Sequence, residues 1–151
     1  QTCALPILHT VITGVIGSDA HIVGEWTIRH AFRQAGFKVV SLGAIVSQEE
    51  FVQAAVETGA SAILVSSIYG HGRIDCQGFR DKLTEAGLED ILLYIGGNLA
   101  IGDYDVQSVV AEYVAMGFNR AYPATTMPQT AVDDLRHDLG IACGDVAPGA
   151  G

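Results

Sequence analysis

The stretch that decides the fold is Ser18-Asp19-Ala20-His21-Ile22-Val23-Gly24. It follows an apolar run over residues 11–16, which predicts a buried strand, and it precedes apolar residues at helical spacing that end at Gly36. A strand that ends in a polar turn and continues into a helix is where open α/β sheets bind ligands. Because Asp19 and His21 are two residues apart, the carboxylate can hold one imidazole nitrogen while the other points outward, as in a metal-ligating histidine.

The rest of the chain alternates strands and helices. Strands are expected over residues 11–16, 37–42, 62–65, 91–95 and 120–122. Helices are expected over residues 23–35, 48–58, 77–86, 106–116 and 128–139. This order predicts an α/β fold, a doubly wound, flavodoxin-like (Rossmann-like) parallel sheet of about five strands, with the ligand crevice beside the first strand.

One domain over residues 10–140 is expected. Residues 1–9 are interpreted as a non-native N-terminal extension, and residues 141–151, with their Gly, Ala and Pro, as a loosely ordered tail.

Composition excludes several classes of function. The chain has 151 residues and a net charge of -9, which argues against a nucleic-acid partner because phosphate binding needs a cationic face. No apolar run approaches membrane-spanning length, so no membrane partner is expected. Cys3, Cys76 and Cys143 form no metal-type or redox pair, and their odd number suits a reducing compartment. A cytoplasmic location is therefore predicted.

Small residues follow two further strands. Ser66 and Ser67 close the third strand, and Gly96 and Gly97 close the fourth. Each glycine alone is explained by the turn it makes, but in a parallel sheet these ends lie beside the turn with His21, and small residues let backbone approach a ligand closely. A narrow channel down the sheet would suit a nucleotide tail of cobalamin detached from cobalt, with the corrin across the edge and the imidazole on the metal.

Three stretches together resemble the small, cobalamin-binding subunit of glutamate mutase (methylaspartate mutase). They are Asp19-Ala20-His21-Ile22-Val23-Gly24, Ser67-Ile68-Tyr69-Gly70-His71-Gly72-Arg73-Ile74-Asp75-Cys76 and Tyr94-Ile95-Gly96-Gly97-Asn98, and the similarity covers residues 11–139. The resemblance implies a cobalamin-binding domain and an isomerase that uses adenosylcobalamin, bound with its own base displaced, for the radical rearrangement of L-glutamate to threo-3-methyl-L-aspartate.

The resemblance also implies residue roles. His21 would be the lower axial ligand of cobalt and Asp19 its hydrogen-bond partner, with no other catalytic residue on this subunit. The residues expected to bind the cofactor are Ser18, Asp19, Ala20, His21, Ile22, Gly24, Ser66, Ser67, Ile68, Gly96, Gly97, Asn98, Leu99, Ala100, Ile101 and Gly102. The partner implied is a large, substrate-binding barrel subunit in a heterotetramer-like complex.

Two departures from the family pattern stand out. The Ser-x-Leu element is Ser66-Ser67-Ile68 here, and Pro123-Ala124-Thr125-Thr126 stands where the family tends to have Gly before Thr. Whether His71, between two glycines at the same edge, touches the corrin stays open.

Other classes of protein share this architecture. A phosphorylation receiver would need an Asp closing the third strand and a Lys closing the fifth, and neither is present. A dinucleotide domain would need a different glycine spacing than Gly14-x-x-Gly17. The alternative that remains is a corrinoid carrier protein of a methyltransferase system, which shares the histidine ligand and usually has an added helical domain ahead of this one.

The cationic residues predict that a second protein holds the substrate. Binding the two carboxylates of glutamate requires a pair of cationic side chains, usually arginines. The chain has 8 Lys and Arg, and Arg73 alone is expected near the carboxyl edge. We therefore expect this chain to carry the cofactor without turning over substrate by itself.

Overall fold

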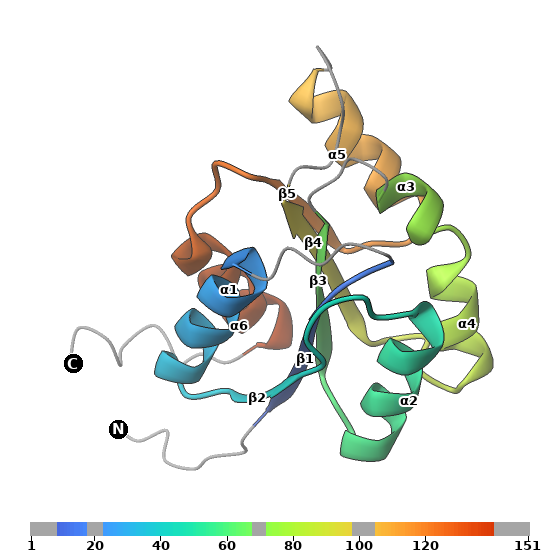
Figure 1. Cartoon of the computed structure of the whole chain (residues 1–151), viewed down its shortest axis with the longest axis horizontal. Helices are drawn as coiled ribbons and strands as arrows, with labels where there is room; N and C mark the ends of the chain where they lie inside the picture. Colours follow the sequence, from blue (N-terminus) through green and yellow to red (C-terminus); the bar gives the residue numbers. More distant parts are fainter. Residues whose placement is uncertain (1–8, 18–22, 68–71, 98–104, 141–151) are drawn as a thin grey trace.

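The computed structural model describes residues 9–17, 23–67, 72–97 and 105–140. Within them five strands alternate with helices (Figure 1). The strands are β1 (Thr10–Val15), β2 (Lys38–Ser41), β3 (Ala62–Ser67), β4 (Leu92–Gly97) and β5 (Arg120–Pro123). The helices are α1 (Val23–Gln34), α2 (Gln48–Thr58), α3 (Gly72–Asp75), α4 (Phe79–Glu85), α5 (Val106–Ala115) and α6 (Pro128–Leu139).

All strand pairs are parallel, and the strand order is β2-β1-β3-β4-β5. This is the flavodoxin-like order, so the predicted fold class is confirmed. Most residues of the central strands β1 and β3 are buried because helices cover both of their faces, as is usual for parallel sheets. The carboxyl ends of β1 and β3 adjoin at the point where the order reverses, which is where such sheets bind ligands.

Two helical layers cover the sheet (Figure 1). On one face, which we call the α2/α4/α5 face, aromatic rings pack in a chain: Phe51 lies 5.7 Å from Phe79, and Phe118 lies 6.2 Å from Phe79 and 5.8 Å from Tyr113, measured between ring centroids. Cys76 is fully buried in this layer. The other face, the α1/α6 face, is built on Phe32, Leu64, Tyr94, Val132 and Leu135 among others.

The ends of the helices follow the sequence signals in most places. Ser47 begins α2 with a capping box, since its side chain accepts from the Glu50 N–H while the Glu50 carboxylate accepts from the Ser47 N–H. The expected helix over residues 77–86 is present as α4, and the four-residue α3 that precedes it was not expected. Gly78 lies between them with φ of +77°, a left-handed conformation that interrupts a helix.

Within the described residues, no helix is long and apolar enough to cross a membrane.

Candidate cobalamin site

The carboxyl edge of the sheet brings the three predicted strand ends together. The Ile16 N–H donates to the Ser66 carbonyl at 3.0 Å, the Gly17 N–H donates to the Val46 carbonyl at 2.9 Å, and Ser66 pairs with Gly96 in the sheet. Five of the predicted cofactor residues are described: Gly24, Ser66, Ser67, Gly96 and Gly97. The others lie outside the described residues: Ser18, Asp19, Ala20, His21, Ile22, Ile68, Asn98, Leu99, Ala100, Ile101 and Gly102, as does His71.

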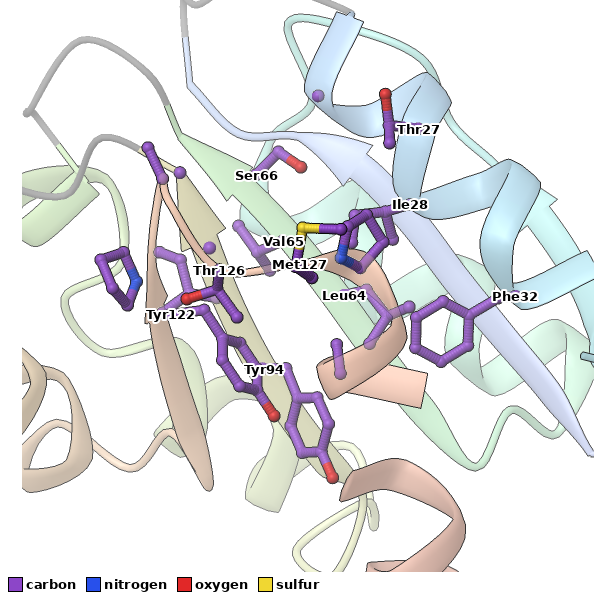
Figure 2. A pocket seen from close by; sticks show the side chains of 18 residues that line it. Thr27, Ile28, Phe32, Leu64, Val65, Ser66, Tyr94, Tyr122, Thr126 and Met127 are labelled. Atoms are coloured by element: carbon purple, nitrogen blue, oxygen red, sulfur yellow. The ribbon is translucent and has the colours of Figure 1, made fainter. Parts of the chain in front are cut away.

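A cavity of about 290 Å³ runs from this edge down the α1/α6 face (Figure 2). Its walls come from β3, β4 and β5 on the sheet side and from the facing sides of α1 and α6. Ser66 lines it near the edge, and the rings of Tyr94 and Tyr122 lie at the other end (Figure 2). Gly24 and Gly96 also line it. A cavity is therefore present on the side of the sheet covered by α1 and α6, and its described lining on the sheet side comes from β3, β4 and β5 and not from the first strand, beside which the crevice was expected.

The two serines of β3 have different roles. Along β3, Leu64 belongs to the core of the α1/α6 face and Val65 to the opposite core, so alternation places Ser66 toward the cavity and Ser67 away from it. Ser67 is buried with 2% of its surface exposed and does not line the cavity. Because successive side chains of a strand point to opposite faces, the sequence alone could have placed Ser66 and Ser67 on opposite faces of the sheet.

The glycines also differ. A Cβ at Gly97 would clash with the carbonyl oxygen of Ser67, and its φ is +119°, so the sheet itself requires glycine there. A Cβ at Gly96 would meet Tyr122 at an ordinary 3.7 Å, and one at Gly24 would meet nothing within 4 Å. The fold does not require these last two residues to be glycine, and both face the cavity, where a side chain would take up ligand space.

A polar cluster beneath the cavity fixes the two tyrosines. The Tyr94 hydroxyl donates to Asp138 on α6, and the Tyr122 hydroxyl donates to Asp134 at 2.6 Å. Arg120 donates to both oxygens of the Asp138 carboxylate, at 2.8 and 2.9 Å. Because both hydroxyls are engaged by α6, the rings present apolar surface to the cavity, which suits a flat aromatic group.

The same contacts shift the pKa of each group. Burial, together with the hydrogen bond to Asp138, raises the pKa of Tyr94 well above its usual range, and burial with the bond to Asp134 does the same for Tyr122. The Arg120 guanidinium lowers the pKa of Asp138. The cluster therefore stays as neutral phenols and an ion pair across the neutral pH range.

Sequence reasoning missed Glu25, whose side chain is fully buried in the first turn of α1. Its Oε2 accepts from the Thr13 hydroxyl at 2.5 Å and from the Ser41 hydroxyl at 2.7 Å. A signal was available, because Glu25 is seven residues before the buried Phe32 and so shares its helical face. Other missed cavity residues are Thr27 and Ile28 of α1, Thr126, and Met127, which is 69% exposed.

The described cations are largely committed to structural contacts. Arg80 donates to the carbonyls of Gly117, Glu89 and Ile91 and to Asn119 on the α2/α4/α5 face. Five other cations also make structural contacts: Arg29 pairs with Glu25, Arg33 donates to Val39, Lys82 pairs with Glu49, Arg120 pairs with Asp138, and Arg136 donates to Ala35. These six side chains already have structural partners, so none of them is expected to bind a substrate carboxylate.

No group of three or more potential metal ligands occurs among the described residues. Burial raises the pKa of the Cys76 thiol to about 12, so this cysteine is a packing residue, as expected, and not a thiolate ligand. The Nδ1 atom of His9 is hydrogen-bonded to the Ser61 hydroxyl oxygen at 2.9 Å. The ring of His30 is exposed and stacks on the ring of Trp26.

The comparison with known proteins identifies the family. The B12 binding domain family matches residues 9–120. A glutamate mutase sigma subunit of Carboxydothermus hydrogenoformans is 53% identical over 131 residues, covering 87% of this chain and 96% of the relative. The chain belongs to the glutamate mutase sigma subunit family. A further sigma subunit, from Clostridium tetanomorphum, is 48% identical over 132 residues, again 87% of this chain and 96% of the relative.

Membership in the sigma subunit family confirms the predicted resemblance and makes this chain a component of an isomerase, a mutase, that has at least one other subunit. It favours this assignment over a corrinoid carrier. A solved structure, a cobalamin-binding protein from Desulfitobacterium hafniense, is similar in fold, with a TM-score of 0.71 and 19% identity over 87% of this chain and 59% of that one. Within the sigma subunit fold, Pro123, Ala124 and Thr126 line the cavity, so the second departure from the family pattern falls on its wall.

Proposed function

We propose that this sigma subunit binds adenosylcobalamin with the nucleotide tail in the cavity of the α1/α6 face and the corrin across the carboxyl edge. His21 is the lower axial ligand of cobalt in this proposal, and Asp19 fixes its tautomer. The observation that carries the proposal is the cavity itself, which opens at the strand ends where the sequence places the Asp19–His21 pair.

The residues present fit the group. A cavity of about 290 Å³ lies near the lower end of the ~300–1,000 Å³ range of ligand pockets, so it accommodates one arm of cobalamin and leaves the corrin outside. Gly24 and Gly96 leave room that the fold does not need. Ser66 and Thr126 supply hydroxyls along the wall, and the tyrosine rings supply an aromatic floor.

When bound, adenosylcobalamin supplies a radical by homolysis of its cobalt–carbon bond, for the rearrangement of L-glutamate to threo-3-methyl-L-aspartate. This chain binds and orients the cofactor, and it holds the proton of the His21 imidazole. In this proposal His21 would ligate cobalt in place of the cofactor's own base, and the Asp19 carboxylate would hold the other ring nitrogen as donor. The proposal assigns the other contacts with the cofactor to the residues that the sequence analysis expects at and after the ends of β1, β3 and β4.

Substrate binding belongs to the partner subunit. The six cations named above are engaged in structural contacts, and an acidic domain of net charge -9 repels a dicarboxylate. We propose that a large barrel subunit covers the upper face of the corrin in a heterotetramer-like, cytoplasmic complex, and that residues 10–140 form the cobalamin-binding unit.

The direct test uses two assays. The purified chain is loaded with Co(II) cobalamin after growth on ¹⁵N-histidine, and its paramagnetic resonance spectrum is compared with that of the unlabelled protein. Coupling that changes with the label supports a protein histidine on cobalt, and coupling to the cofactor's own base contradicts it. In the second assay, 3-methylaspartate is expected from glutamate and adenosylcobalamin only when a large subunit is added, and turnover by this chain alone would overturn the division of roles.

A further inference from the structure

We propose that Glu25 is a positioning residue for the cofactor, which holds the first turn of α1 against the sheet so that the cavity wall and the residues leading into α1 are correctly placed. The inference rests on the proposed function of the same site. Glu25 is not part of the Asp19–His21 pattern, and it does not line the cavity.

The geometry around Glu25 shows how it acts. Its carboxylate lies at 0% exposure between α1 and the sheet and joins two strands, through Thr13 of β1 at 2.5 Å and Ser41 of β2 at 2.7 Å. Thr13 and Ser41 are register partners in the sheet, so one carboxylate oxygen bridges both strands at the same level. The other oxygen, Oε1, makes no hydrogen bond and lies 3.6 Å from the Arg29 guanidinium, one turn along α1.

A buried carboxylate is an expensive way to attach a helix. Removing a carboxylate from water costs several kcal/mol. A buried ion pair such as Glu25 with Arg29 is often no more stabilising than apolar side chains of similar volume. An apolar side chain would hold the helix by contact area, which tolerates rotation and sliding, whereas two hydrogen bonds to one oxygen fix position and direction. The arrangement therefore favours precise placement of α1 over maximal stability.

Placement of α1 matters at this end of the helix. Gly24, the residue before Glu25, lines the cavity, as do Thr27 and Ile28 one turn later. His21 comes four residues before Glu25 in the sequence. On the far side of residues 18–22, Gly17 is fixed by its bond to Val46 and by Asp75, whose carboxylate lies where a Gly17 Cβ would be. Gly17 and the first turn of α1, the described residues on either side of that segment, are thus both held in place.

The test compares Glu25→Gln with a matched control, Arg80→Lys. Glu25→Gln weakens a buried group of hydrogen bonds, and Arg80→Lys weakens a part-buried one. The Arg80 contacts lie on the α2/α4/α5 face, away from the cavity, so this variant controls for a general loss of hydrogen bonding. Three quantities are measured on each purified chain: the melting temperature without cofactor, the Kd for cobalamin from an absorbance titration, and the fraction of Co(II) coupled to protein nitrogen. Thr13→Val, which removes one of the two donors, serves as a second variant if Glu25→Gln fails to fold.

We expect Glu25→Gln to weaken cobalamin binding about 10-fold, near the lower end of the ~10–100-fold cost of losing outer partners of a metal ligand, and to lower the coupled fraction. Arg80→Lys should lower the melting temperature and leave both cofactor readouts at the wild-type level. If Glu25→Gln changes only the melting temperature, Glu25 is structural and the inference is wrong. If wild type itself shows no protein nitrogen on cobalt, the proposed function fails instead, so the two failures are distinguishable.

Discussion

The two faces of the sheet are built differently. On the α2/α4/α5 face, Phe51, Phe79, Phe118 and Tyr113 pack ring against ring. On the α1/α6 face the strands end in small residues, a cavity opens, and the helices are attached through carboxylates on Glu25 and other acidic residues. One face supplies stability by close packing, and the other gives up packing at its carboxyl end to leave space for a ligand.

This comparison predicts that changes on the two faces will separate stability from cofactor binding. A residue on the packed face should alter the free energy of unfolding without altering the affinity of the folded protein. A residue on the cavity wall should do the reverse.

Phe79→Ala should be the most disruptive change. Phe79 is fully buried at the centre of the aromatic chain, and removal of such a side chain typically costs ~3–5 kcal/mol. Urea unfolding monitored by circular dichroism measures the loss. At low temperature, where the variant is still folded, its Kd for cobalamin should equal that of wild type, and a large loss of affinity there would remove the distinction between the faces.

Gly97→Ala and Gly96→Ala form a matched pair in adjacent positions. At Gly97 the added methyl meets the Ser67 carbonyl and the backbone has φ of +119°, so a loss of ~1–3 kcal/mol of unfolding free energy is expected. At Gly96 the methyl makes ordinary contact with Tyr122, so stability should change by less than ~0.5 kcal/mol while the cavity narrows. Cobalamin affinity should fall for Gly96→Ala, and equal stability losses in the two variants would contradict the assignment of their roles.

The acid limb of the stability curve gives the smallest effect. Arg120 holds the pKa of Asp138 below its usual value, so this carboxylate contributes stability at pH values above its unfolded pKa and loses that contribution as the pH falls through its folded pKa. Wild type should therefore lose unfolding free energy between about pH 5 and acid values. In Asp138→Asn the corresponding part of that slope should disappear, and an unchanged slope would show that other carboxyl groups account for it.

Much of the fold followed from patterns in the sequence. The apolar run over residues 11–16 and the alternation of strands and helices predicted the observed strand order. The short α3 was not predicted, and neither was the left-handed Gly78 that separates it from α4, because a glycine in sequence does not reveal its φ.

The candidate site was only partly predictable. Gly96 and Ser66 were expected at the edge and do line the cavity, but the walls formed by Thr126 and Met127 depend on how α6 packs across the sheet, which is not a local property. Glu25 was missed because an acidic residue in a first helical turn is usually explained by the helix dipole. Its spacing from Phe32 indicates the buried face of α1, but its bonds to Thr13 and Ser41 become evident only once α1 lies on β1 and β2.

The central claim is that the cavity holds the nucleotide tail of cobalamin, and cobinamide, which keeps the corrin and lacks that tail, tests it most directly. Burial of a flat aromatic base at ~25 cal/mol per Å² of apolar surface is worth about 2–3 kcal/mol, or about 100-fold in Kd. Binding of both corrinoids is measured by absorbance titration of wild type and of Gly96→Val, whose side chain projects into the cavity. Wild type should bind cobalamin about 100-fold more tightly than cobinamide, and this preference should largely vanish in Gly96→Val. Equal affinity of wild type for the two corrinoids would contradict the account.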